Sequence, residues 1–494
     1  MEDSNFSNSQ GSGPLAFESL GICDACRDRV PCEFFERDGA AWIRKKCPTC
    51  GPTESLVSGD YHVWQAKREL LEYVPMKAKV CRLHCDRCHH DHKPNIVFVD
   101  VTNRCNMNCP ICIATIKGMG FDFNPPMEYF DNLFREIARI QPNPVVLLFG
   151  GEPTVREDLL DIIKTAKGYG LRPHVVTNGI RLEDEDYCRM LCEARVPFRF
   201  AFDGRNADIY ERLRHNRPAY EKKMKALDNL AKFSRRKHTV IATVGKGFND
   251  QYMEDFFQFV HDNRDLISDV GMIPLTENWT PGTFDAGVHT TMEDVEKMVQ
   301  TAIPGGEVEF IPAGISYAMR QVRSFFRHNQ PRSEVLLLAG AHPNCESMTL
   351  LISDGKQYRG INHFLKRPFA EVAVSFAQKA AQMKNRLDRL DNKRFFQRLR
   401  GRIRILWTII PWMLANVRLG RLMGNPFQLL WRAIFGRPAR KIEADRATPR
   451  RARRILRVAM LPFEEEHSID AARLEQCKGV FAYEDTELNQ VRYA

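Results

Sequence analysis

Residues 96–112 read IVFVDVTNRCNMNCPIC, an apolar run that ends in a polar loop carrying three cysteines. The run is rich in β-branched and aromatic side chains, which predicts a short buried strand. Cys105, Cys109 and Cys112 follow it with the spacing C-x3-C-x2-C. A strand that delivers several metal-binding side chains into one loop is typical of an α/β protein that binds ligands beyond its strand ends.

The chain around this stretch repeats one strand-and-helix unit. Between Ile96 and Asn278, six short apolar runs alternate with amphipathic segments, which predicts parallel strands connected by helices. The strand candidates are IVFVDV, VVLLF, HVVT, FRFAF, TVIATV and VGMIP, and the helix candidates are Met127 to Ile140, Glu157 to Gly168, Asp184 to Ala194, Tyr220 to Ser234 and Gln251 to Asn263. We therefore predict an α/β fold, a partial (β/α)6 TIM-like barrel whose site lies in the loops after the strands.

The loops after the first two strands have the composition of a cluster site. Three thiolates can hold three irons of a 4Fe-4S cluster and leave the fourth iron open to a small molecule. A structural zinc site that lacks one ligand is the alternative. The second strand is followed by Gly150, Gly151, Glu152 and Pro153, in which the glycines allow close approach to the backbone and Glu152 offers a carboxylate acceptor. A G-G-E-P loop one unit after a cysteine loop favours the cluster.

These two loops together resemble those of the radical S-adenosylmethionine (radical SAM) enzymes. The resemblance implies a catalytic 4Fe-4S cluster on the Cys105 loop, with S-adenosyl-L-methionine bound beside it. Electron transfer from the cluster would break the C5′–S bond, and the 5′-deoxyadenosyl radical would abstract hydrogen from the substrate. Ile111 stands before the third cysteine, where the superfamily often has an aromatic residue. The implied cofactor contacts are Gly150 to Pro153 with the methionyl amino group, Thr177 and Asn178 with the ribose or carboxylate, and Gly245 and Asn249 with the adenosine.

A second group of cysteines lies near the start of the chain. Cys23 and Cys26 combine with Cys47 and Cys50 in the pattern C-x2-C-x20-C-x2-C, which predicts a tetrahedral site for zinc or a single iron. A folding staple and an electron relay of the rubredoxin type are both open, and the small size of the domain favours the staple. Cys32 is left over and is expected to be a buried free thiol. Fifteen cysteines behind a polar start without a secretion signal favour metal binding over disulfides and predict a cytoplasmic protein.

The triplet spacing also occurs upstream, at Cys81, Cys85 and Cys88, where no strand precedes it and three histidines follow. The cysteine-containing segments, from the first knuckle (Cys23 and Cys26) through HPNCESMTLLISDG, follow one another as in one branch of the radical SAM enzymes. The chain thus resembles the branch of the tetraether and membrane-spanning lipid synthases and the hydroxymethylpterin dimethyltransferase-like proteins. The similarity implies an auxiliary iron-sulfur cluster, with the upstream triplet and Cys345 as candidate ligands. Because Cys477 is the last cysteine of the chain, a complete second auxiliary cluster is not expected.

The net charge of +10 is unevenly distributed along the chain. Residues 384–457 carry 21 Lys or Arg against four acidic residues, a net +17, which leaves −7 for the remainder. This segment contains an uncharged run from Ile405 to Val417 that is too short to cross a bilayer. Trp407, Trp412 and Trp431 suit the headgroup region of an anionic membrane. A helical subdomain packed on the barrel is the alternative and stays open.

The expected organisation has five parts. They are a disordered N-terminus (1–17), a cysteine-rich metal-binding domain (18–94), a radical SAM core barrel (95–280), a barrel extension with the late cluster ligand (281–380) and a basic amphipathic helical region (381–494).

The leading functional hypothesis is hydrogen abstraction from a lipid or other hydrophobic substrate, with carbon-carbon bond formation at alkyl carbons. Such C–H bonds have no acidity for a general base to use, which favours radical chemistry. The expected partners are this substrate, a reductase such as ferredoxin or flavodoxin, and an anionic membrane surface on the cytoplasmic side. One alternative is a radical methyltransferase acting on a pterin-like heterocycle. The other is a non-catalytic zinc-ribbon protein that binds nucleic acid, against which the G-G-E-P loop argues. No catalytic acid or base is assigned.

Overall fold

The structure is a computed structural model of the 494-residue chain. It describes residues 17–70, 94–114, 116–141, 143–276, 284–313, 341–390, 395–421, 455–462, 467–485 and 490–493. Residues 1–16 of the predicted disordered N-terminus, the upstream triplet of Cys81, Cys85 and Cys88, and Trp431 lie outside the described residues.

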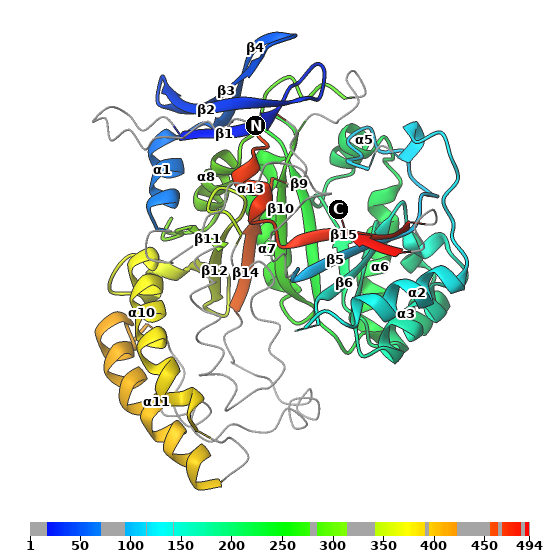
Figure 1. Cartoon of the computed structure of the whole chain (residues 1–494). Coiled ribbons are helices and arrows are strands. Elements are labelled where there is room, and N and C mark those ends of the chain that lie inside the picture. Colours follow the sequence, from blue (N-terminus) through cyan, green and yellow to red (C-terminus); the bar gives the residue numbers. More distant parts are fainter. Residues whose placement is uncertain are drawn as a thin grey trace.

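Six parallel strands in chain order form the centre of the main sheet (Figure 1). Each pairs with the next in parallel register, as repeated strand-helix-strand units require. All six overlap the strands predicted from the sequence, which confirms the α/β barrel architecture. The strands are β5 (Ile96–Thr102), β6 (Val145–Gly150), β7 (Arg172–Thr177), β8 (Phe198–Ala201), β9 (His238–Val244) and β10 (Ile267–Pro274).

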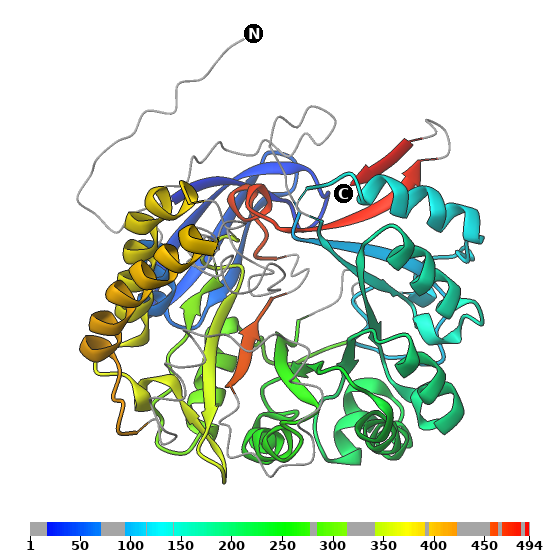
Figure 2. The ribbon, with the colours of Figure 1, turned by 90° about the horizontal axis from the view of Figure 1, so that it is seen from below.

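Helices cover the outer face of this curved sheet (Figure 2). Side-chain alternation along β5 separates the two faces. Val97, Val99 and Val101 pack with the helices in the main core, whereas Ile96, Phe98 and Asp100 point to the inner face. Five helices match the predicted ones within three residues at each end, and one, α5, was not predicted. The helices are α2 (Met127–Ile137), α3 (Leu159–Gly168), α4 (Glu185–Glu193), α5 (Ala207–Arg214), α6 (Ala219–Phe233) and α7 (Met253–Asp262).

Strands from the C-terminal region extend the sheet at both edges. β14 (Ile455–Met460) adds in parallel to β10, and β15 (Gly479–Asp485) adds in parallel to β5. β12 (Ser347–Ser353) pairs antiparallel with β14, and among the described strands β11 (Ile311–Pro312) and β16 (Gln490–Tyr493) end the sheet, so strand pairing does not close the barrel. The predicted helical C-terminal region is therefore helical only in part. Short strands of this kind gain stability from an existing sheet edge, which no local sequence pattern reports.

A separate four-stranded antiparallel sheet forms the cysteine-rich domain above the barrel (Figure 1). Phe34, Ile43 and Trp64 form its small core together with α1 (Tyr61–Glu69). The buried Lys67 ammonium of α1 donates to Glu293 and Glu296 of α8 (Met292–Ala302), each at 2.7 Å, and so fixes the domain to the barrel. The strands are β1 (Phe17–Ile22), β2 (Arg29–Arg37), β3 (Ala40–Cys47) and β4 (Gly51–Ser58).

Two long helices, α10 (Phe369–Asp388) and α11 (Phe395–Asn416), form a hairpin that projects from the barrel (Figure 1, yellow and orange). The Trp412 indole N–H donates to Ser375 Oγ at 3.1 Å, and its ring lies 5.0 Å from that of Phe376, so Trp412 packs against α10. The prediction that Trp412 faces a membrane is therefore wrong. Trp407, in contrast, is 78% exposed. Among the described residues, no helix is long and apolar enough to span a membrane.

Candidate active site

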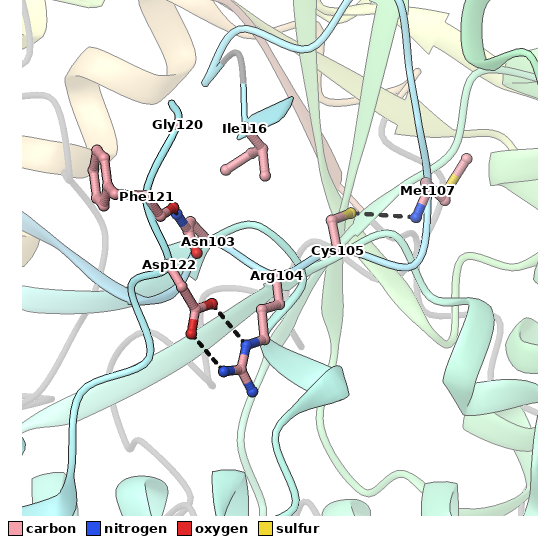
Figure 3. Close-up of a pocket in the computed structure, with 8 residues that line it drawn as sticks. All are labelled: Asn103, Arg104, Cys105, Met107, Ile116, Gly120, Phe121 and Asp122. Carbon is pink, nitrogen blue, oxygen red and sulfur yellow. Dashed lines mark hydrogen bonds and ion pairs between the residues drawn. The ribbon is translucent and has the colours of Figure 1, made fainter. Parts of the chain in front are cut away.

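The three cysteines of the opening stretch lie in the loop directly after β5. Cys105 is exposed, Cys109 and Cys112 are partly buried, and all three are free thiols. The Met107 backbone N–H donates to Cys105 Sγ at 3.4 Å, and the Cys112 N–H donates to the Cys109 carbonyl at 3.2 Å. A pocket of about 450 Å³ opens beside Cys105 (Figure 3). Its remaining lining residues are Asn103, Arg104, Met107, Ile116, Gly120, Phe121 and Asp122.

The donor set of this loop fits a 4Fe-4S cluster better than a single ion. Around one ion, as in the ribbon described below, the ligand atoms lie within 4.8 Å of one another. Among the described residues, the Cys105 loop forms no such group. A cubane cluster takes each thiolate on a different iron, so its ligands are spaced more widely. The loop offers three free thiols beside a pocket, which is the donor set of a 4Fe-4S cluster with one open iron.

The G-G-E-P loop packs directly on the cysteine loop. The Gly151 N–H donates to the Thr102 carbonyl at 2.7 Å, and the Glu152 N–H donates to the Arg104 carbonyl at 2.9 Å. A Cβ on Gly150 would lie 2.4 Å from the Thr102 carbonyl oxygen, and Gly150 also has a φ of +114°. The glycines are therefore required for contact between two backbones, whereas the sequence interpretation gave them approach to a ligand.

The Glu152 carboxylate is 1% exposed and connects the G-G-E-P loop to the loop after β7. Its Oε1 accepts hydrogen bonds from the Thr154 N–H at 3.0 Å, the Thr154 hydroxyl at 2.6 Å and the Thr177 hydroxyl at 2.7 Å. Its Oε2 accepts one from the Asn178 N–H at 2.6 Å. Four protein donors leave this carboxylate little capacity for a ligand, and its role in the structure is to hold two loops together.

The other predicted cofactor residues lie in the same layer of loops. Asn178 Nδ2 donates to Asn106 Oδ1 at 2.7 Å, which joins the β7 loop to the cysteine loop. Asn249 is fully buried: its Oδ1 accepts from the Gly245 N–H at 3.0 Å, and its Nδ2 donates to the Asp203 and Thr243 carbonyls at 3.1 and 2.8 Å. The side chain of Asn249 therefore shapes the loop after β9. The cofactor contacts assigned to these residues stay predictions.

A buried charge cluster under the cysteine loop was missed from the sequence. Arg214 donates to both carboxylate oxygens of Asp203, each at 2.9 Å, and its charge also acts on the Cys109 thiol. The Lys223 ammonium donates to the Ala201 carbonyl at 2.7 Å and to the Asn178 carbonyl. Burial lowers the pKa of Lys223 to about 8. Asp203 follows β8 in the D-G-R-N loop, but Arg214 and Lys223 lie on helices 11 and 20 residues later, and only the fold brings them together.

The four ribbon cysteines form a compact ligand group. Cys23, Cys26, Cys47 and Cys50 bring their sulfur atoms within 4.8 Å of one another, which confirms the predicted metal-binding arrangement. Lys45, only 1% exposed, donates to Asp24 at 2.6 Å beside the first knuckle. Cys32 is buried, as expected.

Cys345 is the member of the predicted auxiliary set that falls within the described residues. The Cys345 N–H donates to the His342 carbonyl at 2.9 Å, and Arg68 of α1 donates to Asn344 at 2.6 Å, so the H-P-N-C turn is held against the ribbon domain. The Cys477 thiol lies close enough for its charge to act on Cys345. The proximity of these two thiols could not be predicted from the sequence, because they are 132 positions apart in the chain.

Family models match the two cysteine regions that the geometry singles out. A model described as the radical SAM superfamily matches residues 99–260. The chain contains a radical SAM domain. A second model, described as the HMPTM N-terminal zinc ribbon domain, matches residues 18–59. The predicted superfamily, with its 4Fe-4S cluster and S-adenosyl-L-methionine, and the predicted metal-binding N-terminal domain are thereby confirmed.

Relatives of the radical SAM domain include enzymes with several substrates. The 7,8-dihydro-6-hydroxymethylpterin dimethyltransferase of Methanocaldococcus jannaschii is 30% identical over 269 residues, 52% of this chain and 53% of that protein. The Fe-coproporphyrin III synthase of Methanosarcina barkeri is 36% identical over 95 residues, 19% of this chain and 23% of that protein. The structure of SuiB of Streptococcus suis bound to S-adenosylmethionine is 13% identical with a TM-score of 0.37, covering 54% of this chain and 67% of that one. The chain spans about half the length of the first of these relatives.

Proposed function

We propose that this chain is a radical SAM enzyme that abstracts hydrogen from carbon. The observation that supports this most is the hydrogen bonding of the G-G-E-P loop to the cysteine loop, through the N–H groups of Gly151 and Glu152. This contact fixes the predicted cluster ligands relative to the predicted cofactor loop. The bound cluster and S-adenosyl-L-methionine would supply reductive C5′–S cleavage and a 5′-deoxyadenosyl radical. The residues assigned to hold these groups are Cys105, Cys109, Cys112, Gly150, Gly151, Pro153, Thr177 and Asn178, while the Glu152 carboxylate holds their loops together.

Buried charged residues lie next to the predicted cluster ligands. Burial raises the pKa of the Cys109 thiol, and the positive charge of the neighbouring Arg214 guanidinium opposes this rise. Burial opposes the ionisation of Asp203, but Arg214 outweighs it and holds the pKa of that carboxyl below its usual value. Because Asp203 stays ionised, it keeps the guanidinium in place. The exposed side of Cys105 is open to a reductase such as ferredoxin or flavodoxin, which we assign as the electron donor.

The reaction class is tested by anaerobic reconstitution and measurement of iron, sulfide and 5′-deoxyadenosine. Cys105→Ala should lose cluster iron and all 5′-deoxyadenosine formation. Cys188→Ala removes a buried thiol of α4, away from the barrel mouth, and should keep both. A wild-type protein that contains zinc but accepts no iron would refute the proposal and support the non-catalytic zinc-ribbon alternative.

A lipid or another hydrophobic molecule is the first candidate substrate, with carbon-carbon bond formation at alkyl carbons. It is supported by α11, whose apolar residues at helical spacing stay exposed on one side of the projecting hairpin. Exposed Arg400 and Arg404 lie among them, which suits an anionic membrane surface. The apolar residues are Phe396, Leu399, Ile403, Trp407 and Leu414.

Membrane binding through α11 is tested by flotation with phosphatidylglycerol vesicles and with phosphatidylcholine vesicles. The wild type should float with the anionic vesicles, and Trp407→Ser should reduce the bound fraction several-fold. The control Trp64→Phe changes a tryptophan that is 1% exposed in the ribbon core and should not affect flotation. Equal recovery of all three proteins from the soluble fraction would remove the support for a lipid substrate.

Radical methylation of a pterin-like heterocycle is the second candidate. It is supported by the 30% identity to the hydroxymethylpterin dimethyltransferase over 269 residues and by the match of residues 18–59 to the HMPTM zinc ribbon domain. Anaerobic incubation with dithionite, S-adenosylmethionine and 7,8-dihydro-6-hydroxymethylpterin should yield a product heavier by one or two methyl groups. Absence of this product, while 5′-deoxyadenosine is formed, would exclude the pterin and leave the lipid.

A further inference from the structure

An acidic side chain on the inner face of the barrel has not been used in the site described so far. Asp100 lies in β5, two residues after Phe98 and on the same face, because side chains alternate along a strand. No hydrogen bond or ion pair reaches its carboxylate from the described part of the chain. The Glu152 carboxylate, in comparison, accepts four hydrogen bonds from the protein. Asp100 is half-buried, and its carboxylate is free to accept hydrogen bonds from a bound ligand.

Asp100 lies next to the predicted cofactor loop. A Cβ on Gly150 would be 3.4 Å from Asp100 Oδ1, so the carboxylate lies close to the first residue of G-G-E-P. In the parallel register, Asp100 stands beside Phe149 of β6. A group bound at this carboxylate would thus be adjacent to the loop assigned to S-adenosylmethionine, as a substrate of the radical must be.

The wall beside Asp100 is aromatic. The Phe98 ring stacks on Phe481 of β15 with 4.9 Å between centroids and meets Phe149 edge-on at 5.8 Å. The Phe149 and Phe481 rings are 6.2 Å apart. Such a wall favours a flat or apolar ligand and makes the neighbouring carboxylate costly in the absence of a partner. Burial alone raises the pKa of Asp100 to about 6, so at neutral pH this carboxylate is charged and short of donors.

We propose that Asp100 is the specificity-determining residue of the barrel interior and accepts hydrogen bonds from N–H groups of the substrate. An alkyl chain offers no donor and would bury the charge unpaired, whereas the amino-pyrimidinone edge of a planar heterocycle presents two adjacent N–H groups to one carboxylate. The inference rests on the proposed radical SAM function and, within it, favours the heterocycle over the lipid.

The inference is tested by combining a change in the ligand with a substitution in the protein. Two probes are used, 6-hydroxymethylpterin and the corresponding lumazine, which carries a carbonyl in place of the 2-amino group. Binding is followed by quenching of probe fluorescence with the reconstituted full-length protein, in the absence of turnover. The wild type should bind the pterin about 10- to 100-fold more tightly than the lumazine, because the lumazine leaves a charged acceptor without one of its donors.

Asp100→Asn should abolish most of this preference, because an amide cannot accept both hydrogen bonds. The control Asp161→Asn neutralises an exposed acid of α3 and should keep the full preference. A wild type that binds both probes equally, or neither, would overturn the inference, even if Asp100→Asn does not fold. Formation of 5′-deoxyadenosine is measured on the same samples. Its presence without pterin preference would leave the proposed function intact, and its absence would refute the proposed function independently of the binding result.

Discussion

Glu152 serves the site through protein contacts at both oxygens of its carboxylate. Donors from Thr154, Thr177 and Asn178 converge on a side chain that is 1% exposed, so the loops after β6 and β7 have one relative position. The Asp100 carboxylate differs from it, because it has no donor from the described chain and lies close to Gly150. One carboxylate is therefore available for structure and the other for a ligand.

Glu152→Gln should destabilise the folded chain by about 1–3 kcal/mol. The amide NH2 of glutamine would face the Asn178 N–H, and two donors cannot form a hydrogen bond with each other. The free energy of unfolding of the apo-protein measures this loss. Glu157→Gln is the control, since its side chain is 85% exposed and its removal should change stability by less than about 0.5 kcal/mol. Equal stability of the two variants would show that Glu152 does not hold the loops together.

Because the Asp100 carboxylate has no donor from the described chain, we expect Asp100→Asn to stabilise the folded protein, and the gain in stability to depend on pH. The folded pKa, about 6, lies above the usual aspartate value of 3.8, so between these values the folded chain binds more protons than the unfolded chain. The contribution of Asp100 to the free energy of unfolding therefore falls as pH rises from about 4 to 6. Asp100→Asn removes this penalty and should raise the melting temperature of the ligand-free protein by about 2–4 °C at pH 8 and by less at pH 5. A lower melting temperature at pH 8 would contradict an unpaired carboxylate.

Among the elements, the six central strands and five of their helices could be predicted from the sequence. Strand β5 shows the reason, because IVFVDV is apolar except for Asp100 and ends at a loop that contains the three cysteines. The local sequence pattern did not predict elements whose stability comes from contacts with segments far away in the sequence. β14 is a six-residue strand in a basic segment, and it forms because β10 and β12 pair with both of its edges. The contact of Arg214 with Asp203 likewise depends on the position of α5 relative to β8.

The cysteine loop and the G-G-E-P loop behave as one element, which Gly151→Ala tests. A Cβ at this position would be 2.3 Å from the Arg104 carbonyl oxygen, so the two loops must separate. We expect the variant to fold but to retain less than about a tenth of the wild-type iron after reconstitution, because displacement of Arg104 moves Cys105. Gly168→Ala in α3 is the matched control: a Cβ there meets no atom within 4 Å, and stability should rise slightly. Full iron content in Gly151→Ala would show that the loops are independent.

In the whole molecule, the C-terminal segment and the ribbon are joined to the barrel by polar contacts. His467 lies 3.3 Å from Asp24 beside the first knuckle, Asp470 bridges to Gly21 of β1, and the chain then continues into β15 at the β5 edge. The sheet edge beside the predicted active site is thus formed by the last part of the chain, and the same segment contacts the metal-binding domain. Cys345 and Cys477 come close to one another in this region, next to α1.

The ribbon domain is also joined to the barrel by the buried ion pairs of Lys67 with Glu293 and Glu296. Loss of these ion pairs should release the ribbon domain. Lys67→Met leaves two carboxylates in a site where burial already raises the pKa of Glu296, so the variant should be less stable by about 3–5 kcal/mol. Limited proteolysis should then cleave between the ribbon and the barrel, while residues 99–260 keep their cluster. Lys46→Met is the matched control, because this lysine pairs with Glu33 while 55% exposed and should cost less than about 1 kcal/mol. Resistance of Lys67→Met to cleavage would mean that α13 (Ala471–Glu475) and the H-P-N-C turn hold the ribbon without the ion pair.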